Sequence, residues 1–309
     1  MFSSLHQIIM ALVPVAFVIF LGWFAGYRKI IDNKHSHSLA TYVMNFSFPC
    51  GLFILAATTK PSQLFNIRFV SAFWIGLMGM YLISLIVYKV ILKRNMKESG
   101  QGAFVCAFPD MAFMGIPIFT SLLGATSLIS IAIGNICTSL IMIPIVTIIL
   151  SGKESGQSIG SIIINVIKKP LVFAPILGVI FSLLGLHLPD LAKSCLTMLS
   201  GTTSGVSLFT LGLIMSAYVV RMSKLVVLNI VLKNIIHPLI MIGLVMLFGV
   251  KGIYAKEAIL LCAMPTATMT TMFGLKYKTL TEESTSSTIL GTIVSLVTLT
   301  IFMLIVGIN

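Results

Sequence analysis

Apolar stretches long enough to cross a membrane follow one another along this chain, separated by short polar loops. Crossing a bilayer takes about 20 mostly apolar residues, and ten segments qualify. Hydrophobic residues make up 58% of the 309 positions and charged residues only 9%, whereas a soluble domain has about 25% charged residues. The sequence therefore predicts an all-α integral membrane protein with ten transmembrane helices. Their expected ranges are 7–26, 38–58, 69–92, 102–122, 126–150, 162–185, 191–217, 225–249, 255–274 and 286–308.

The basic residues indicate how these helices are oriented. Most of the 20 Lys and Arg residues lie in the loops after the odd-numbered spans, and an excess of Lys and Arg marks cytoplasmic loops. We therefore expect a multi-pass protein of the cytoplasmic membrane with both termini outside. No basic residue precedes the first apolar stretch, so we expect a retained helix and not a signal peptide. The net charge of +12 comes with no aromatic-interleaved basic module, which argues against nucleic-acid binding.

Proline and glycine interrupt the fourth span. It contains Pro109, Gly115 and Pro117, and proline both removes a backbone donor and clashes with the preceding turn, so a helix breaks there. Broken backbone at membrane depth is tolerated only where protein or a water-filled cavity surrounds it. Asp110 is the one of the eight acidic residues that we expect deep inside a span, which makes it a functional candidate. The structural alternative is a neutral carboxyl group that only holds the broken helix.

The second half of the chain repeats this pattern. Cys262-Ala-Met-Pro265 lies 156 positions after Cys106-Ala-Phe-Pro109. Each half contains five spans, an odd number, so the second half must be inverted relative to the first. Residues 1–155 and 156–309 are therefore predicted to be two inverted five-helix repeats, with helices 4 and 9 broken and crossing. In transporters built from such repeats, the binding site lies near the midplane, where the broken helices meet.

The residues at the two breaks are the expected substrate-binding site. A half-helix that begins at a break presents unpaired N–H groups and a partial positive charge, which suit a carboxylate. Asn135 and Asn45, in the fifth and second spans, are amides that could orient the ligand, although an isolated amide also joins helices. Threonine hydroxyls after the second break could also donate to the ligand. They can equally bond back to carbonyl groups of their own helix, so both roles stay open. At the breaks themselves, the candidate residues are Pro109, Asp110, Met111, Ala112, Pro265, Thr266, Ala267 and Thr268.

A second polar group supports this site. Lys233, Asn234 and His237 lie together in the eighth span. Lys233 either attracts an anion, pairs with Asp110 or extends to the membrane surface. The five cysteines are isolated in apolar segments and form no CxxC pair, so neither a metal site nor a disulfide framework is indicated. Zincin, nucleophile-elbow and phosphate-loop motifs are missing, and we expect no enzyme and no cofactor.

Several of these motifs resemble a known family. Ala107-Phe-Pro-Asp-Met-Ala-Phe-Met-Gly-Ile-Pro117, Asn45-Phe-Ser-Phe-Pro49, Ala263-Met-Pro-Thr-Ala267 and Asn135 with Pro144 make the whole chain similar to the auxin efflux carrier family of bacterial permeases and plant auxin carriers. The resemblance implies a scaffold, often dimeric, from spans 1, 2, 6 and 7. It implies a mobile transport domain from spans 3–5 and 8–10. Bacterial members are described as permeases for malate, malonate or related acids, and many members have asparagine where this chain has Asp110.

Together these features favour a secondary transporter for a small organic anion such as malate, malonate or an auxin-like carboxylate. We expect elevator-type alternating access, a homodimer through the scaffold and a coupling proton carried by Asp110, with sodium as the other coupling ion to consider. One alternative is a cation/proton antiporter with Asp110 as its ion site, since inverted repeats with broken helices serve that function too. Another is a ligand-sensing membrane receptor with the same fold.

Overall fold

The structure, a computed structural model, describes residues 2–58, 66–151, 164, 168, 170–217 and 219–307. Within these ranges the chain is helical and forms no strand, as predicted. The start of the expected sixth span lies outside the described residues, and ten spans in two inverted repeats stay a prediction. Five helical stretches are long and apolar enough to cross a membrane: Asn33–Thr58, Ile67–Ile91, Asp190–Ser216, Lys224–Leu247 and Thr281–Ile305.

The described elements of the two halves end at corresponding places. The first half contains α1 (Phe2–Tyr27), α2 (Ser36–Tyr42), η2 (Val43–Ser47), α3 (Phe48–Thr58), α5 (Ile67–Ile86), α6 (Met96–Ala107), η4 (Met111–Gly115), α7 (Ile116–Leu123), α8 (Leu128–Cys137), η6 (Thr138–Met142) and α9 (Ile143–Ser151). The second contains α11 (Pro170–Leu183), α12 (Asp190–Ser200), α13 (Thr203–Ser216), α14 (Lys224–Val231), η8 (Leu232–Ile236), α15 (His237–Leu247), α16 (Ile253–Ala263), α17 (Thr268–Tyr277) and α18 (Thr281–Ile305). The interrupted helices α6 and α16 end 156 positions apart, at Ala107 and Ala263.

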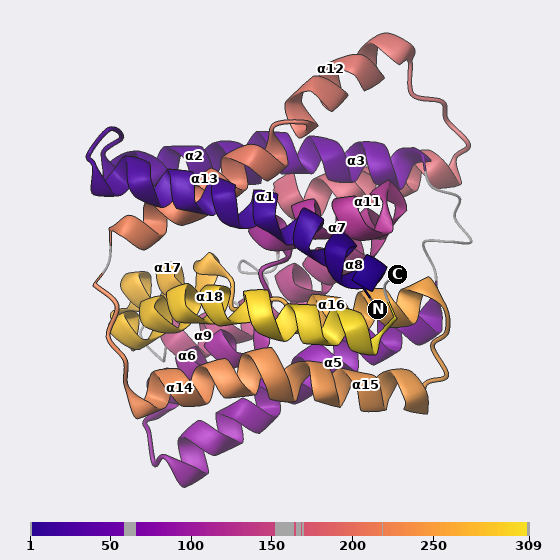
Figure 1. The fold of residues 1–309 in the computed structure, drawn as a ribbon. Coiled ribbons are helices and arrows are strands. Elements are labelled where there is room, and N and C mark those ends of the chain that lie inside the picture. Colours follow the sequence, from indigo (N-terminus) through magenta and orange to yellow (C-terminus); the bar gives the residue numbers. More distant parts are fainter. Residues whose placement is uncertain are drawn as a thin grey trace.

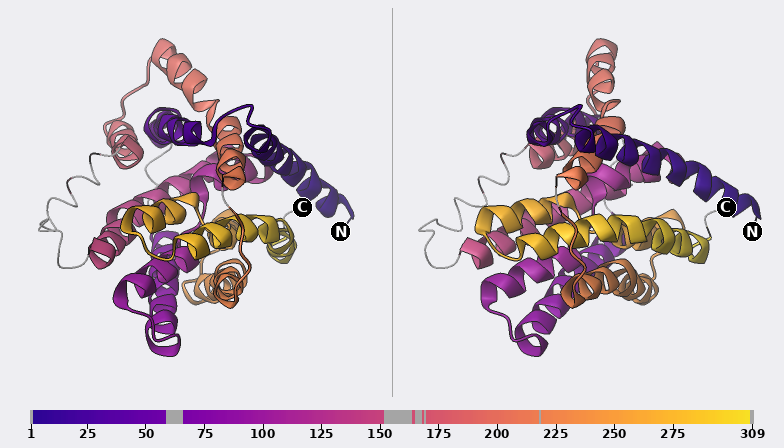
Figure 2. Two further views of the ribbon diagram at one scale, coloured as in Figure 1. Left: turned by 90° about the vertical axis from the view of Figure 1, so that its left-hand side faces the viewer. Right: turned by 60° about the vertical axis from the view of Figure 1, so that its left-hand side comes forward.

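The helices pack in two layers. In the upper layer of Figure 1, α1 packs along α13 and α3 packs along α11, while α12 projects away from the rest. In the lower layer, α5 packs on α6 and α15, α14 on α18, and α15 on α16. The two further views show the same separation (Figure 2). The interrupted helices α6 and α16 therefore belong to the lower layer, and the turn η4 after the first interruption packs against α13 of the upper layer.

Glycines bring α1 and α13 unusually close together. A Cβ atom on Gly22 would lie 2.0 Å from the carbonyl oxygen of Phe209, and one on Gly212 would lie 1.9 Å from the carbonyl oxygen of Ile19. Small residues at such positions allow the backbones of membrane helices to approach and gain van der Waals contact. The contact is reciprocal, because each helix supplies one glycine.

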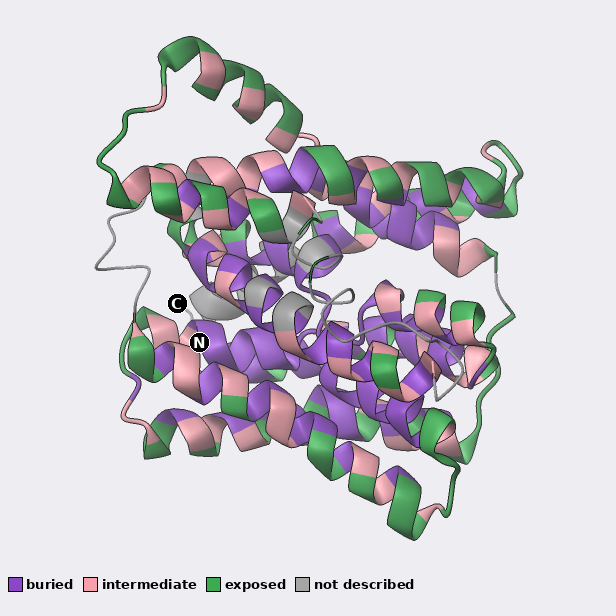
Figure 3. Ribbon diagram, turned by 180° about the vertical axis from the view of Figure 1, so that it is seen from behind, coloured by how far each residue is buried: buried purple, intermediate pink, exposed green. Residues whose placement is uncertain are grey.

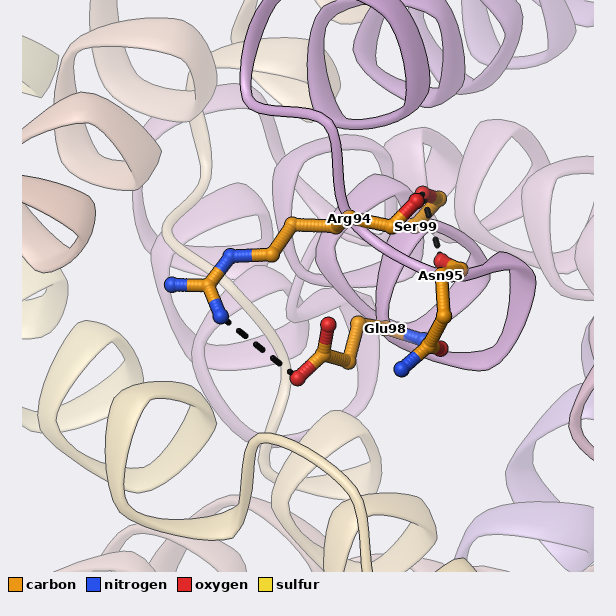
Figure 4. A network of polar contacts seen from close by, with 4 residues as sticks. All are labelled: Arg94, Asn95, Glu98 and Ser99. Atoms are coloured by element: carbon orange, nitrogen blue, oxygen red, sulfur yellow. Dashed lines mark hydrogen bonds and ion pairs between the residues drawn. The ribbon is translucent and has the colours of Figure 1, made fainter.

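The first interrupted helix has a well-defined start (Figure 4). The Asn95 side chain accepts a hydrogen bond from the Glu98 backbone N–H at 2.9 Å, and the Ser99 hydroxyl donates to the Asn95 carbonyl oxygen at 2.7 Å. An ion pair of 3.6 Å joins Arg94 to Glu98. A side chain that caps the first turn fixes where a helix begins. From Ser99 to Ala107 every residue of α6 is buried, so the helix runs through the interior, where the buried residues gather in Figure 3.

The close contact between α1 and α13 leads to a first prediction. Gly212→Ala should destabilise the protein by about 1–3 kcal/mol, because the added methyl group has no room beside the α1 backbone. Gly205 lies on the same helix with nothing within 4 Å of an added Cβ, so Gly205→Ala is the matched control and should not destabilise. The midpoint of thermal denaturation of the purified protein in detergent measures both effects. Equal midpoints for the two variants would contradict the packing described.

Candidate functional site

The two helix interruptions lie side by side and satisfy each other's backbone. The Asp110 N–H donates to the Pro265 carbonyl oxygen at 2.9 Å, and the Ala267 N–H donates to the Phe108 carbonyl oxygen at 3.1 Å. These two bonds form an antiparallel bridge between Pro109 and Thr266. Breaking a helix at a proline frees backbone groups that must find partners inside a protein. Here the groups freed in one half of the chain find them in the other.

Asp110 has one oxygen in use and one free. Its side chain is 1% exposed, and Oδ1 accepts a hydrogen bond from the Phe113 N–H at 3.0 Å, which caps the π-helical turn η4. Oδ2 is buried and has no hydrogen-bond partner among the described residues. Buried polar atoms are almost always paired. The free oxygen is therefore available for a proton, a cation or a ligand.

Asp110 lines a small cavity. Its volume is about 30 Å³, which is room for a couple of water molecules. The helix α17 begins at its edge, and its first turn has no side-chain cap, so N–H groups at that end are unpaired by side chains. The lining residues are Met44, Phe108, Pro109, Asp110, Met111, Phe113, Asn135, Ile143, Ala267, Thr268 and Met269.

The structure brings most of the predicted site residues to this cavity, but not all of them. Asn135 lines it and donates to the Ile131 carbonyl oxygen at 3.1 Å. Asn45 is exposed and does not line it, whereas its neighbour Met44 does. The side chain of Ala112 lies outside the described residues. Pro109, Asp110, Met111, Ala267 and Thr268 also line the cavity.

The remaining predicted residues near the interruptions have structural contacts. The Thr266 hydroxyl donates to the Val105 carbonyl oxygen at 2.8 Å, so it holds the bridge and is not free for a ligand. Pro265 contributes the carbonyl oxygen that Asp110 binds. The Gly115 N–H donates to the Asp110 carbonyl oxygen at 3.0 Å, and Pro117 is buried at the start of α7.

Lys233 places a positive charge beside the second interruption. It is fully buried, which excludes an extension of its side chain to the membrane surface. Its Nζ donates to the Cys262 carbonyl oxygen at 2.7 Å and lies 3.2 Å from Nδ1 of His237. The Cys262 carbonyl belongs to the C-terminal turn of α16, where a cation is stabilised. No ion pair joins Lys233 to Asp110 among the described contacts, and Asn234 donates to the Gly291 carbonyl oxygen at 2.8 Å.

The sequence analysis missed a second buried carboxylate. We expected Asp110 to be the one acidic residue deep inside a span, but Glu257 in α16 is 2% exposed and accepts a hydrogen bond from the hydroxyl of Ser130 in α8. Glu257 lies close to the end of an apolar segment, so its position in the sequence did not predict that it is buried. The available signal was Gln101, a polar residue at the corresponding position of the first half.

Comparison with known proteins identifies the family. The sequence profile of a family described as membrane transport protein matches residues 7–303. The chain belongs to this family, that of the auxin efflux carriers. It is therefore a multi-pass membrane transporter and not an enzyme.

Three relatives cover nearly the whole transporter. The uncharacterized transporter YfdV of Escherichia coli is 25% identical over 92% of this chain and 94% of its own length. A putative malonate transporter of Rhizobium meliloti is 20% identical over 93% of this chain and 92% of its own length. Auxin efflux carrier component 5 of Arabidopsis thaliana is 19% identical over 95% of both chains.

The cap made by Asp110 gives a second prediction. Asp110→Ala should destabilise the transporter by about 1 kcal/mol because the Phe113 N–H loses its acceptor. Asp110→Asn should retain most of the stability, because an asparagine side-chain oxygen also accepts at a helix N-terminus. Thermal denaturation in detergent compares the two. If both variants were equally destabilised, the carboxylate would do more than cap the turn.

Proposed function

We propose that this transporter is a secondary active permease that moves a small organic carboxylate across the cytoplasmic membrane. The observation that carries the proposal is the meeting of the two interrupted helices around one cavity. A backbone interruption at membrane depth needs a protein or water environment, and a transporter uses it to bind a ligand in mid-membrane.

The proposed architecture is ten spans in two inverted repeats, with broken helices 4 and 9 crossing at the cavity. The correspondence between the ends of α6 and α16 supports it. The close approach of the start of α1 and the end of α18 in Figures 1 and 2 supports termini on one side, outside the cell in our proposal. We assign the α1–α3 and α11–α13 layer to a scaffold and the other layer to a transport domain. Exposed apolar residues on α12, such as Leu191 and Met198, suit a homodimer contact through the scaffold.

The cavity lining suits an organic anion. The N-terminus of α17 has no side-chain cap, and its partial positive charge favours the carboxylate. The buried charge of Lys233 adds to the local positive potential. Side chains of Met111, Phe113 and Met269 offer apolar contact to the carbon skeleton. A ligand as large as malonate needs the cavity to widen, and a movement of one layer against the other provides this in an elevator-type cycle.

Proton coupling follows from the position of Asp110. An anionic substrate beside an ionised carboxylate would be repelled, and a proton on the free oxygen removes this repulsion. Proton and substrate therefore bind together, and both are released on the other side. This makes the transporter a proton–anion symporter.

A cation/proton antiporter is the second candidate, because the free oxygen of Asp110 would also attract a cation. Against it, the described residues contain no group of three His, Cys, Asp or Glu side chains that could hold a metal ion. Sodium is held by several oxygen ligands, and the cavity offers few. A ligand-sensing receptor is the third candidate, and flux in the absence of any partner protein separates it from a transporter.

Transport assays with purified protein in liposomes test the proposal and provide the third prediction. We expect uptake of labelled malonate or malate to rise under an inward proton gradient, and Asp110→Asn to lose this stimulation because it cannot carry the proton. Empty liposomes and wild-type protein without a gradient are the controls.

Each other result assigns a different function. Uptake that is insensitive to both the gradient and the substitution would make the protein a uniporter and leave Asp110 a structural role. Cation flux without uptake of either acid would favour the antiporter. The absence of any flux would favour the receptor.

A further inference from the structure

Glu257 is a buried carboxylate that lies apart from the substrate cavity. It occupies the second turn of α16, and its oxygen accepts a hydrogen bond from Ser130, which is fully buried on α8. Neither residue lines the cavity around Asp110. The bond joins two helices that both lead to that cavity, because α16 ends before Pro265 and α8 carries Asn135.

No described cation neutralises Glu257. The described ion pairs are Lys34–Asp32, Arg94–Glu98 and Arg221–Glu282. The helices that pack on α16 are α5, α8, α15, α18 and η8. Of the basic residues on these elements or next to α16, Lys251 is exposed and the others have different neighbours. Lys256 donates to the Gly307 carbonyl oxygen, Lys233 to that of Cys262, and Arg68 lies near Gly249.

The other titratable groups on α16 and on these neighbouring helices are few. Tyr254 lies one turn before Glu257 and interacts electrostatically with the Glu257 carboxyl group. The others are Tyr81 on α5, Cys137 on α8, His237 on α15, Cys262 on α16, and Glu282 and Glu283 on α18. None of these can supply the positive charge that an ionised Glu257 needs, except His237, which contacts Lys233 instead.

The first half of the chain contains the same bridge made with an amide. Gln101 lies 156 positions before Glu257 and is also fully buried. Its Nε2 donates to the Thr270 carbonyl oxygen and to the Ser284 hydroxyl, both at 2.8 Å. An amide therefore suffices to join a broken helix to its neighbours. A carboxyl group at the matching position adds one property that an amide lacks, the ability to bind and release a proton.

We propose that Glu257 is a second proton-binding site of the transport cycle, located at the contact between α16 and α8. A buried carboxylate without a cation is much more stable with its proton bound. The proton is therefore held while the contact between α16 and α8 is closed to water, and it is released when the movement of their layer against the scaffold admits water to this contact. This inference rests on the proposed proton-coupled transport and adds a second proton to each cycle.

Trp74 allows proton binding to be measured without any substrate. Its side chain lies with Ile129 and Ala132 of α8 around one cavity, so its fluorescence reports on the surroundings of α8. The chain has two tryptophans, and Trp23→Phe leaves Trp74 as the single one. In this background we expect a fluorescence transition between about pH 5 and pH 9.

The variants decide whether Glu257 causes this transition. Glu257→Gln should abolish it, whereas Asp110→Asn and the exposed-carboxylate control Glu282→Gln should retain it. Ser130→Ala keeps the carboxyl group but removes a donor to its ionised form, so the midpoint should rise by about one pH unit. A transition that persists in Glu257→Gln, or a wild type without any transition, would overturn the proposal. If Glu257→Gln fails to fold, the pH midpoint of the fluorescence transition in Ser130→Ala decides. A midpoint equal to that of the wild type would then overturn the proposal.

A transport assay tests the role of this proton in the cycle. With the membrane potential held at zero, a gradient of one pH unit drives about tenfold accumulation per coupled proton. We expect labelled malonate to accumulate about a hundredfold in the wild type and about tenfold in Glu257→Gln. Equal accumulation in both would remove Glu257 from the cycle. If neither malonate nor malate is carried, the proposed function fails. The fluorescence transition still confirms or rejects the proton site in that case.

Discussion

The structure depends on the two backbone hydrogen bonds that join the interrupted helices. An unpaired peptide group away from water costs several kcal/mol, and each proline break leaves such groups behind. The break after Ala107 is tolerable because Pro265 and Ala267 supply an acceptor and a donor, and the reverse is equally true. Neither break would be stable alone in an apolar environment. The site therefore belongs to both halves of the chain.

The paired breaks are not chemically equivalent, and the proposed function depends on this difference. In the first half, the helical segment after the break is capped by the carboxylate of Asp110. In the second half, the segment after the break is α17, which follows Ala267 and has no side-chain cap. One half therefore contributes an acidic group with a free oxygen, and the other contributes a helix N-terminus without a side-chain cap. A proton and an anion can be bound by adjacent groups without competing for the same atoms.

The sequence predicted those parts of the site that have a local cause. Proline breaks a helix whatever surrounds it, so the interruptions at Pro109 and Pro265 were predictable, and so was the interest of an acidic residue beside one of them. The rotation of a helix about its own axis could not be predicted from the sequence. Successive residues point about 100° apart, and Met44 lines the cavity where Asn45 was expected. The burial of Glu257 also depends on α8, a partner distant in sequence, and its signal in the sequence is the polar Gln101 at the corresponding position of the first half.

Packing density indicates where such a molecule can move. Within the upper layer, Gly22 and Gly212 bring α1 and α13 into contact that leaves no room for an added methyl group, and within the lower layer the paired breaks join α6 to α16. The boundary between the layers contains a cavity of about 310 Å³, lined by α3, α5, α8 and α11, and another of about 680 Å³, lined by α1, α13 and α18. Closely packed units do not deform continuously, and a shift of one layer against the other is the movement that the proposed transport cycle requires.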